Sequence, residues 1–304
     1  MIIIADGERL QKKRGLDMDI KTYREAMDME QKRTFLVVKS NDIVQKARFN
    51  LSLQQQKILL YAISQIKPSD KPNQTYTIDI PQMCEVCGID KSSSNIHQIY
   101  QNLEEIKKSS FWFKTEGSSK RDLIDWLINV SVIEYSNPQN PKKATPRKIS
   151  FKFDSRLEGY LFELASYFTR YELINILPMR SAYSVRLYEL MCSYAELGGI
   201  VIENTELYEM LQIKETMIFA EFRRNVIAKA ISEINKFTNL FVTTKLKRTG
   251  RTCTAIDFAI KKKTTLETSV AFASGVVAID SKNNPQNAEM NKHLISTFTD
   301  MIIQ

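Results

Sequence analysis

A segment expected to form a helix, residues 221–238, carries the side chains best suited to chemistry in this sequence. At about 100° per residue its apolar residues gather on one side, which predicts that this side packs inward. These residues are Phe222, Val226, Ala230, Ile234 and Phe237. The opposite side carries basic, amide and small residues: Arg224, Asn225, Ala228, Lys229, Ser232, Asn235 and Lys236. Such a face is typical of a helix that binds DNA, and an exposed face without a ligand is the alternative.

The residue types on this face match the hydrogen-bonding groups of bases. An arginine can donate two hydrogen bonds to guanine in the major groove, and an asparagine can pair with adenine. The small side chains of Ala228 and Ser232 would let the helix approach the base edges. We therefore expect Arg224 and Asn225 to contact bases, while Arg223, near the flank of the face, contacts phosphate.

A second basic group lies in the predicted hairpin that follows. Strands expected at 240–247 and 253–260 flank a turn at 248–251, and the basic residues of this hairpin are Lys245, Lys247, Arg248 and Arg251. A basic hairpin tip suits phosphates or a minor groove. The run 261–263 is three lysines, which either bind phosphate as well or only solubilise the end of the strand.

The positive charge of the chain is concentrated in this region. The chain has 43 Lys and Arg against 35 Asp and Glu, a formal net charge of +8. Residues 214–263 alone hold twelve basic and four acidic side chains, again a net of +8, so the remainder sums to zero. A neutral body with one basic segment suits a polyanion, either nucleic acid or an acidic membrane surface. A solvated charged face is the alternative, but such faces usually mix both signs.

Several features bear on the compartment. The chain has 304 residues, enough for about two domains, and no run approaches the roughly 18 apolar residues of a membrane span. The apolar run 2–4 is too short for the core of a signal peptide. Four cysteines do not make a disulfide framework, which agrees with a reducing compartment. We expect a cytoplasmic protein with no membrane partner.

Residues for several enzyme classes are missing. The chain has only two histidines, His97 and His293, which excludes the zinc motif H-E-x-x-H and the paired-histidine metal cradle of rolling-circle nicking enzymes. Neither a phosphate-binding G-x-x-x-x-G-K-[ST] loop nor a G-x-S-x-G elbow occurs. We expect no enzymatic activity. A nickase or recombinase with Tyr188 or Tyr194 as nucleophile is an alternative that no histidine or acidic cluster supports.

Cys84 and Cys87 form a C-x-x-C pair within a short predicted helix. A zinc site would need two more ligands, and His97 is the only histidine nearby. We therefore predict two packed cysteines, with no metal and no cofactor.

The elements that would position these groups occur twice along the chain. Residues 51–66, 75–80, 82–86, 92–108, 111–113 and 123–135 are predicted to form a helix, a strand, two helices and a hairpin, the order of a winged helix. Residues 184–197, 200–203, 204–211, 221–238 and 240–260 repeat this order. YTIDIPQMCEVCGID, from Tyr76, aligns with IVIENTELYEMLQIK, from Ile200. Duplication of one small unit explains the match, and chance similarity of amphipathic helices is the alternative.

The fold class predicted is α+β, with two tandem winged-helix domains related by internal duplication. The boundaries expected are 1–34 for an N-terminal extension, 35–150 and 151–263 for the two winged helices, and 264–304 for a flexible C-terminal tail. Residues 137–147 are interpreted as a loop or linker, 157–177 as helical, and 281–287 as a flexible linker within the tail. The first unit is less basic, and its outward residues are Ser94, Asn95, Gln98, Gln101 and Asn102.

Ordered blocks of the sequence resemble the initiator replication proteins of theta-replicating plasmids. They are FLVVKSNDIVQKARFNLSLQQQKILLYAISQIKP from Phe35, TYTIDIPQMCEVCGID from Thr75, FTRYELINILPMRSAYSVRLYELMCSY from Phe168 and EFRRNVIAKAISEINKFTNLFV from Glu221. The resemblance covers about residues 35–261. It implies two tandem winged helices that bind directly repeated sequences, called iterons, in double-stranded DNA at a plasmid origin.

The same resemblance implies different roles for the two winged helices. The C-terminal winged helix would supply the main major-groove helix, 221–238. The N-terminal one would add DNA contacts, here through Ser94, Asn95 and Gln98, and a dimer interface. A homodimer in equilibrium with a monomer, autorepression by the dimer, origin opening, and contact with a host helicase or initiator are further expectations from the family. A winged-helix transcriptional repressor without a replication role is the alternative, because it shares every feature derived from the residues.

Overall fold

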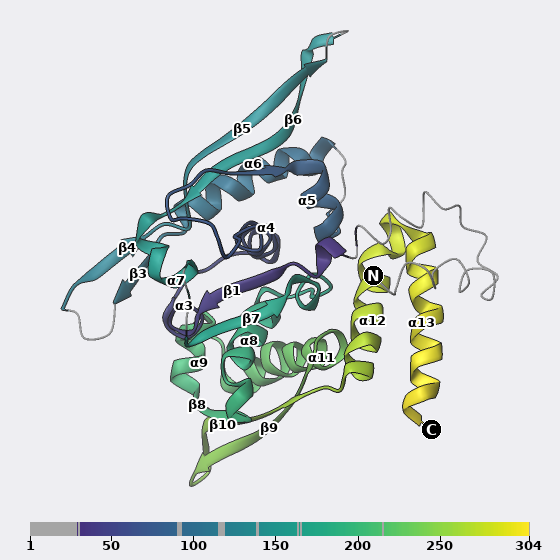
Figure 1. The fold of residues 1–304 in the computed structure, drawn as a ribbon. Coiled ribbons are helices and arrows are strands. Elements are labelled where there is room, and N and C mark those ends of the chain that lie inside the picture. Colours follow the sequence, from purple (N-terminus) through teal and green to yellow (C-terminus); the bar gives the residue numbers. More distant parts are fainter. Residues whose placement is uncertain are drawn as a thin grey trace.

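The computed structural model describes residues 29–303 except 30, 90–92, 115–118, 138–139, 163, 165 and 215. Figure 1 shows two mixed helix–strand halves on either side of a two-stranded sheet, with two long helices along one flank. No helix among the described residues is long and apolar enough to cross a membrane.

The first half has the order of elements predicted for a winged helix. Its elements are α4 (Leu53–Ile63), β2 (Tyr76–Asp79), α5 (Ile80–Cys87), α6 (Ser93–Lys108), β5 (Leu127–Asn137) and β6 (Asn140–Phe153), with sheet order β2-β6-β5. Local signals set the helix ends. Ser52 and Gln55 form a capping box at the start of α4, and Asp79 caps α5. Gly88, with φ +67°, ends α5 in the left-handed conformation.

A small hairpin is inserted into this half between α6 and β5. It consists of β3 (Phe111–Lys114) and β4 (Arg121–Ile124), which pair only with each other among the described strands. Phe111 and Phe113 are buried, whereas Trp112 between them is 63% exposed. The expected single strand over 123–135 is therefore wrong: the chain turns at Asp125 and Trp126, and β5 joins a different sheet.

The interpretation of 137–147 as a linker is also wrong. The described residues of this segment, 137 and 140–147, belong to the β5–β6 hairpin, in which Ser136 pairs with Ala144. Figure 1 shows this hairpin projecting from the first half. Strand β6 extends to Phe153, so the expected boundary at residue 150 falls inside a strand of the first sheet.

The second half repeats the topology. Its elements are α8 (Ala182–Ser193), the 3₁₀ turn η3 (Ala195–Leu197), β8 (Gly199–Glu203), α9 (Asn204–Met210), α10 (Phe219–Phe222), the π-helical segment η4 (Arg223–Ile227), α11 (Ala228–Phe237), β9 (Leu240–Thr249) and β10 (Thr252–Lys262). The sheet order β8-β10-β9 matches β2-β6-β5 of the first half. The prediction of two tandem winged helices is confirmed.

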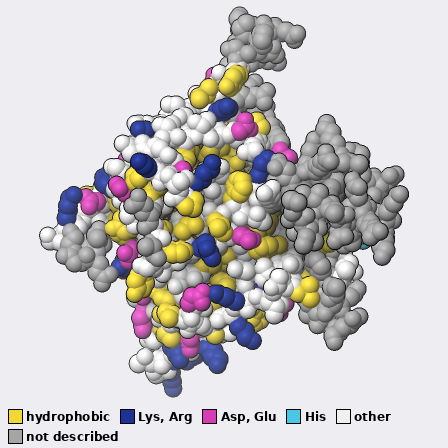
Figure 2. All heavy atoms as spheres, in the orientation of Figure 1, with side chains coloured by type: hydrophobic (Ala, Val, Ile, Leu, Met, Phe, Trp, Pro, Cys, Tyr) yellow, Lys and Arg dark blue, Asp and Glu magenta, His cyan; other side chains and the backbone are white. Residues whose placement is uncertain are grey.

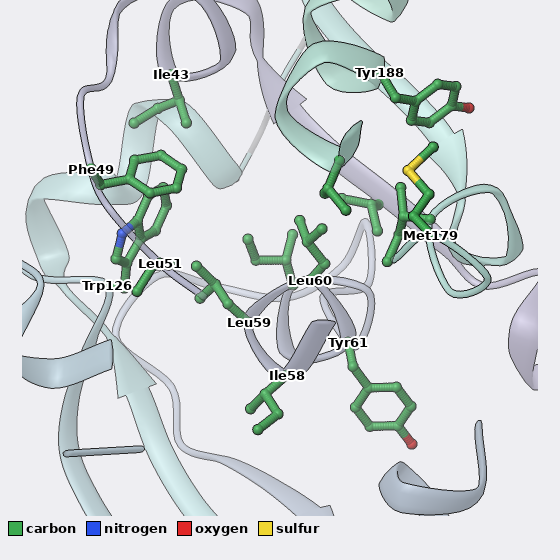
Figure 3. Packing of buried hydrophobic residues seen from close by; sticks show 14 of the residues in the cluster. Ile43, Phe49, Leu51, Ile58, Leu59, Leu60, Tyr61, Trp126, Met179 and Tyr188 are labelled. Atoms are coloured by element: carbon green, nitrogen blue, oxygen red, sulfur yellow. The ribbon is translucent and has the colours of Figure 1, made fainter. Parts of the chain in front are cut away.

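A two-stranded sheet lies between the halves. Strand β1 (Leu36–Ser40), followed by α3 (Asn41–Lys46), pairs antiparallel with β7 (Phe168–Glu172). The helix expected over 157–177 is thus wrong: apart from η1 (Ser155–Leu157), α7 (Glu158–Leu161) and η2 (Leu173–Asn175), the segment's main element is β7. The buried apolar residues form one cluster through both halves. Figure 3 shows Leu60 of α4 between Trp126 of the first half and Met179 of the second.

Glu189 of α8 is the centre of a buried charge cluster beside this sheet. Its carboxylate accepts a hydrogen bond from the Tyr171 hydroxyl at 2.6 Å and forms an ion pair with Lys39 of β1. Arg186 Nη1 lies 3.7 Å from the same carboxylate. Burial lowers the pKa of Lys39, and the charge of Glu189 opposes that shift. The single carboxylate of Glu189 therefore balances two buried cations, Lys39 of β1 and Arg186 of α8.

The flexible tail expected over 264–304 is wrong. Residues 265–303 form two helices, α12 (Thr265–Asn283) and α13 (Pro285–Ile303), which pack against each other as an antiparallel pair. Thr264 and Glu267 form a capping box at the start of α12. The expected linker 281–287 contains only a short connection, because Pro285 begins the next helix.

Helix α12 is fixed to both halves. Asp280 accepts two hydrogen bonds from the Arg33 guanidinium, at 2.7 and 2.8 Å, with both side chains buried. Arg33 also donates to the carbonyl groups of Glu85 and Val86 at the end of α5. On the other side, α12 packs against α11 and η2 of the second half. Arg33 belongs to the expected N-terminal extension, of which residues 1–28 and 30 lie outside the described residues.

Candidate nucleic-acid interface

The candidate recognition helix runs from Phe219 to Phe237 through α10, η4 and α11. Its apolar side packs inward as predicted: Phe222, Val226, Ala230, Ile234 and Phe237 are all buried. The predicted outer residues are exposed: Arg223, Arg224, Asn225, Ala228, Lys229, Ser232 and Lys236. The structure therefore brings these seven residues together on one continuous helix surface.

A π-helical turn, which helical periodicity does not predict, lies at Arg223–Ile227 of this helix. The Ala228 N–H donates to the Arg223 carbonyl, five residues back. The wider turn lets the successive residues Val226 and Ile227 both reach the core, at 3% and 2% exposure. It leaves Arg223 to Asn225 as three consecutive exposed residues at the helix start. Turns of this kind are frequent at functional sites.

Asn235 does not belong to the outer face, contrary to expectation. Its side-chain amide donates to the Val242 carbonyl at 2.9 Å, and its oxygen accepts from the Val242 N–H at 2.7 Å. Both polar groups of the amide are thus occupied in joining α11 to β9. By contrast, Arg224 Nε contacts only the neighbouring Asn225 side chain, at 3.4 Å.

The wing is the β9–β10 hairpin, whose tip is formed by Arg248 to Arg251 with Gly250 at φ +62°. Lys245, Arg248 and Arg251 are exposed and form no ion pair with another described residue. Lys247 differs, because its ammonium lies 3.1 Å from the Asp257 carboxylate. Figure 2 shows Lys and Arg side chains gathered at the lower edge of the molecule, where Figure 1 places this hairpin.

The three lysines at 261–263 separate into different roles. Lys263 donates to the Asn235 and Thr238 carbonyl groups, at 2.5 and 2.8 Å, and so satisfies the C-terminus of α11. Lys262 forms an ion pair with Glu196. Lys261 is exposed. Only Lys261 of this run has a side chain left to contact phosphate.

The corresponding helix of the first half, α6, is close to neutral. Gln98 is exposed on α6, as predicted, whereas the side chains of Ser94 and Asn95 lie outside the described residues. Asn102 was expected on the outer face and is instead 3% exposed. Lys108 pairs with Glu104 and Glu105, at 3.6 and 3.3 Å. Between the two helices compared, α6 and the helix 219–237, the exposed basic face is therefore that of the second half.

Three of the residues considered for other chemistry, Cys84, Cys87 and Tyr188, lie in the core, whereas Tyr194 is partly buried. Cys84 and Cys87 are each 2% exposed, and burial raises the pKa of the Cys87 thiol to about 12. No group of three or more His, Cys, Asp or Glu side chains that could hold a metal occurs in the described part of the chain. Tyr188 is fully buried and its hydroxyl donates to Asn239 at 2.9 Å. It cannot reach a DNA phosphate as a nucleophile.

The fold and this surface define a tandem winged-helix protein whose second half carries a basic helix face and a basic wing. The chain matches the family described as "Initiator Replication protein, WH1" over residues 36–192 and that described as "Initiator Rep protein, WH2" over residues 204–260. The chain belongs to this family of initiator replication proteins.

Two similar proteins align with this chain over nearly their whole length. An uncharacterized 27.6 kDa protein of Escherichia coli is 20% identical over 240 residues, which cover 74% of this chain and 95% of that protein. The crystal structure of the Pi initiator protein in complex with iteron DNA has a TM-score of 0.57 at 20% identity, covering 75% of this chain and 97% of that one. This likeness extends the shared fold across both winged helices.

Proposed function

We propose that this protein initiates plasmid replication by binding directly repeated DNA at an origin, with the helix 219–237 in a major groove. The observation that carries the proposal is the exposed face of that helix, on which three basic residues, Arg223, Arg224 and Lys229, form no ion pair with another described residue. The fold is shared with a protein whose structure was solved with iteron DNA, which supports the choice of ligand.

The roles of individual residues follow from their positions. Arg224 and Asn225 contact bases, with Ala228 and Ser232 giving access, while Arg223, Lys229 and Lys236 contact phosphates. The wing residues Lys245, Lys247, Arg248 and Arg251 bind the backbone or the adjacent minor groove.

The first winged helix has a lesser part in DNA binding and a part in dimerisation. Ser94, Asn95 and Gln98 contact DNA more weakly, and the first winged helix forms the dimer interface. The monomer opens the origin and recruits a host helicase or initiator. The dimer represses the promoter of the gene that encodes the protein. The chain itself catalyses no reaction. The protein acts in the cytoplasm.

The test is fluorescence anisotropy with the repeat-containing DNA that flanks the gene and a shuffled duplex, measured over a salt series. Specific recognition predicts roughly 10³-fold tighter binding to the repeats and a steep salt dependence. Equal binding to both duplexes would show a general phosphate binder. A plasmid that carries only this gene and its flanking DNA should replicate in a suitable host, and failure to replicate would favour the repressor.

Arg224→Ala is expected to cost roughly 1–3 kcal/mol of binding free energy and to relax specificity at one base position. The reason is that only the planar guanidinium can donate two parallel hydrogen bonds to guanine. Anisotropy with each single-base variant of one repeat measures this. Arg224→Lys is the control, because it keeps the charge and loses the two-pronged geometry. Full specificity in the lysine variant would reassign Arg224 to phosphate.

Removing the three unpaired wing charges together, by Lys245→Ala, Arg248→Ala and Arg251→Ala, is expected to weaken binding to all duplexes alike. Each lost phosphate contact should reduce the slope of log affinity against log salt by about 1. Lys247→Ala is the comparison within the wing: it should reduce the salt slope less than any one of the three, since Asp257 already balances that ammonium at 3.1 Å. A triple variant with an unchanged salt slope would place the wing away from DNA.

A further inference from the structure

Glu221 is the one exposed acid on the helix 219–237, whose other exposed charges are all positive. The two other described acids of the basic segment are engaged. Glu233 accepts a backbone N–H at 3.1 Å, and Asp257 pairs with Lys247 at 3.1 Å. Glu221 forms no ion pair with another described residue. It therefore places an unbalanced negative charge on the surface that otherwise suits a polyanion.

The Glu221 carboxylate also makes no local hydrogen bond within the described part of the chain. A glutamate at the third helical position often completes a capping box with a serine or threonine cap, but here the cap is Ile218, whose side chain supplies no hydrogen bond. Burial, and then the charge of Glu221, raises the pKa of Tyr208. The Tyr208 hydroxyl nevertheless donates to the Met217 carbonyl at 2.9 Å. Both oxygens of the carboxylate are thus left to accept from a ligand.

Glu221 lies one turn before the residues assigned to bases. Residues three and four positions apart share one side of a helix, so Glu221 shares its side with Arg224 and Asn225, and all three are exposed. Arg224 Nε contacts the Asn225 side chain, at 3.4 Å, rather than the acid. The N-terminal residues of a recognition helix are the ones that reach base edges. With this helix in a major groove, the carboxylate faces the same base edges as Arg224.

A carboxylate in a major groove distinguishes one base from the other three. Phosphates repel it, so it weakens binding to every sequence that offers it no donor. Guanine and thymine present only acceptors there, and adenine places the acceptor N7 beside its amino group. Cytosine presents its amino group without an adjacent acceptor. The base that suits an unpaired carboxylate is therefore cytosine.

We propose that Glu221 determines sequence specificity by accepting a hydrogen bond from the amino group of a cytosine, a role that rests on the proposed binding of the helix 219–237 in a major groove. At any other base the same charge repels the DNA. Glu221 therefore strengthens binding to the repeat and weakens binding to unrelated sequences. Because Arg224 follows by one turn, its guanine and this cytosine belong to neighbouring base pairs.

Two variants of Glu221 separate the hydrogen bond from the charge. Glu221→Ala removes both, and we expect it to bind the repeat duplex roughly fivefold more weakly and the shuffled duplex about twofold more tightly. Glu221→Asp keeps the charge and withdraws the carboxylate by one methylene, so it should lose affinity for the repeat and gain none for the shuffled duplex. Glu158→Ala is the matched control, because it removes an exposed and unpaired acid of α7 and should change the affinity for both duplexes by the same factor.

A modified base locates the contact. N4-methylcytosine still pairs with guanine, but its methyl group takes the place of the amino hydrogen that faces the major groove. It replaces each cytosine of one repeat in turn, and binding is measured by fluorescence anisotropy. We expect one position at which it weakens binding by the unaltered chain roughly fivefold and leaves binding by Glu221→Ala unchanged. Thermal unfolding shows that each variant is folded.

Three outcomes would overturn the proposal. Glu221→Asp could bind both duplexes as the unaltered chain does, which would assign the acid to the helix dipole alone. Glu221→Ala could change both affinities by one factor, as the control does. The methylated base could have no effect at any cytosine. Equal binding of the unaltered chain to the repeat and the shuffled duplex would instead overturn the proposed function, so the two failures are distinguishable.

Discussion

Asp280→Ala is expected to lower the free energy of unfolding by about 3–5 kcal/mol, because it leaves the Arg33 guanidinium buried without its counterion. Both oxygens of Asp280 accept from Arg33, at 2.7 and 2.8 Å, and one also accepts from Asn287 at 2.6 Å. The carboxylate therefore joins the α12–α13 pair to Arg33, in the segment before β1, and through Arg33 to the end of α5. Chemical denaturation followed by circular dichroism measures the change.

Two further variants separate charge from shape at this site. Asp280→Asn keeps the size of the side chain but not the charge, and should recover only a minor part of the loss. Glu289→Ala removes an acid from the same helix pair whose partner, Lys292, is exposed, and should cost less than about 1 kcal/mol. If Asp280→Ala costs no more than Glu289→Ala, then the helix pair is held by its apolar contacts alone.

Glu189→Ala is expected to be equally severe, at about 3–5 kcal/mol, because it leaves two buried cations without an anion. The side chains of Lys39 and Arg186 are 2% and 7% exposed, so water cannot replace the carboxylate. The Tyr171 hydroxyl would lose its acceptor as well. Because the cluster joins β1 to α8, the loss should appear as cooperative unfolding at lower denaturant concentration.

Glu196→Ala is the matched control for this prediction. Glu196 also pairs with a lysine, Lys262, but its side chain is 84% exposed. Exposed pairs contribute little, so less than about 1 kcal/mol should be lost. Similar losses in Glu189→Ala and Glu196→Ala would mean that the buried cations find other partners in the native state.

Local signals were sufficient to predict the second winged helix. The helix 219–237 has apolar residues at three- and four-residue steps, and the hairpin after it has a Gly250 turn, so each element is specified within its own segment. The buried face that the sequence predicts is the buried face of the structure. The DNA contacts themselves remain predictions.

Strand β7 could not be recognised from its own residues. Phe168, Tyr171 and Leu173 are spaced as well for a helix as for a strand, and periodicity cannot separate the two in so short a run. What decides the outcome is pairing with β1, far away in the sequence. Strand propensity depends on such partners more than helix propensity does.

Polar composition misled the interpretation of two other segments. Residues 137–147 are rich in Asn, Pro and Lys, which is typical of a loop, yet they pair as a projecting hairpin. Residues 281–287 are equally polar, but the buried contact of Asp280 with Arg33 fixes the helix in which they begin. A charged residue in a polar stretch gives no sign that it will be buried.

Within the candidate site, the errors concern asparagines on predicted outer faces. Asn102 and Asn235 each lie on a polar stripe of a helix, yet Asn102 is buried and Asn235 holds the backbone of β9. An amide serves the backbone as well as it serves a base, and helical periodicity does not distinguish these uses. Arg223 and Arg224, on the same helix as Asn235, are exposed, as predicted.

The Arg33–Asp280 contact can form only late in the synthesis of the protein. Its two residues are 247 positions apart in the sequence. Arg33, which donates to the end of α5, therefore acquires its counterion Asp280 only after nearly the whole chain has been translated. A nascent chain that stops before residue 280 carries the helix 219–237 and the β9–β10 wing but lacks the Arg33–Asp280 ion pair. A product truncated there therefore keeps its basic surface and loses the contact by which α12 joins the first half to the second.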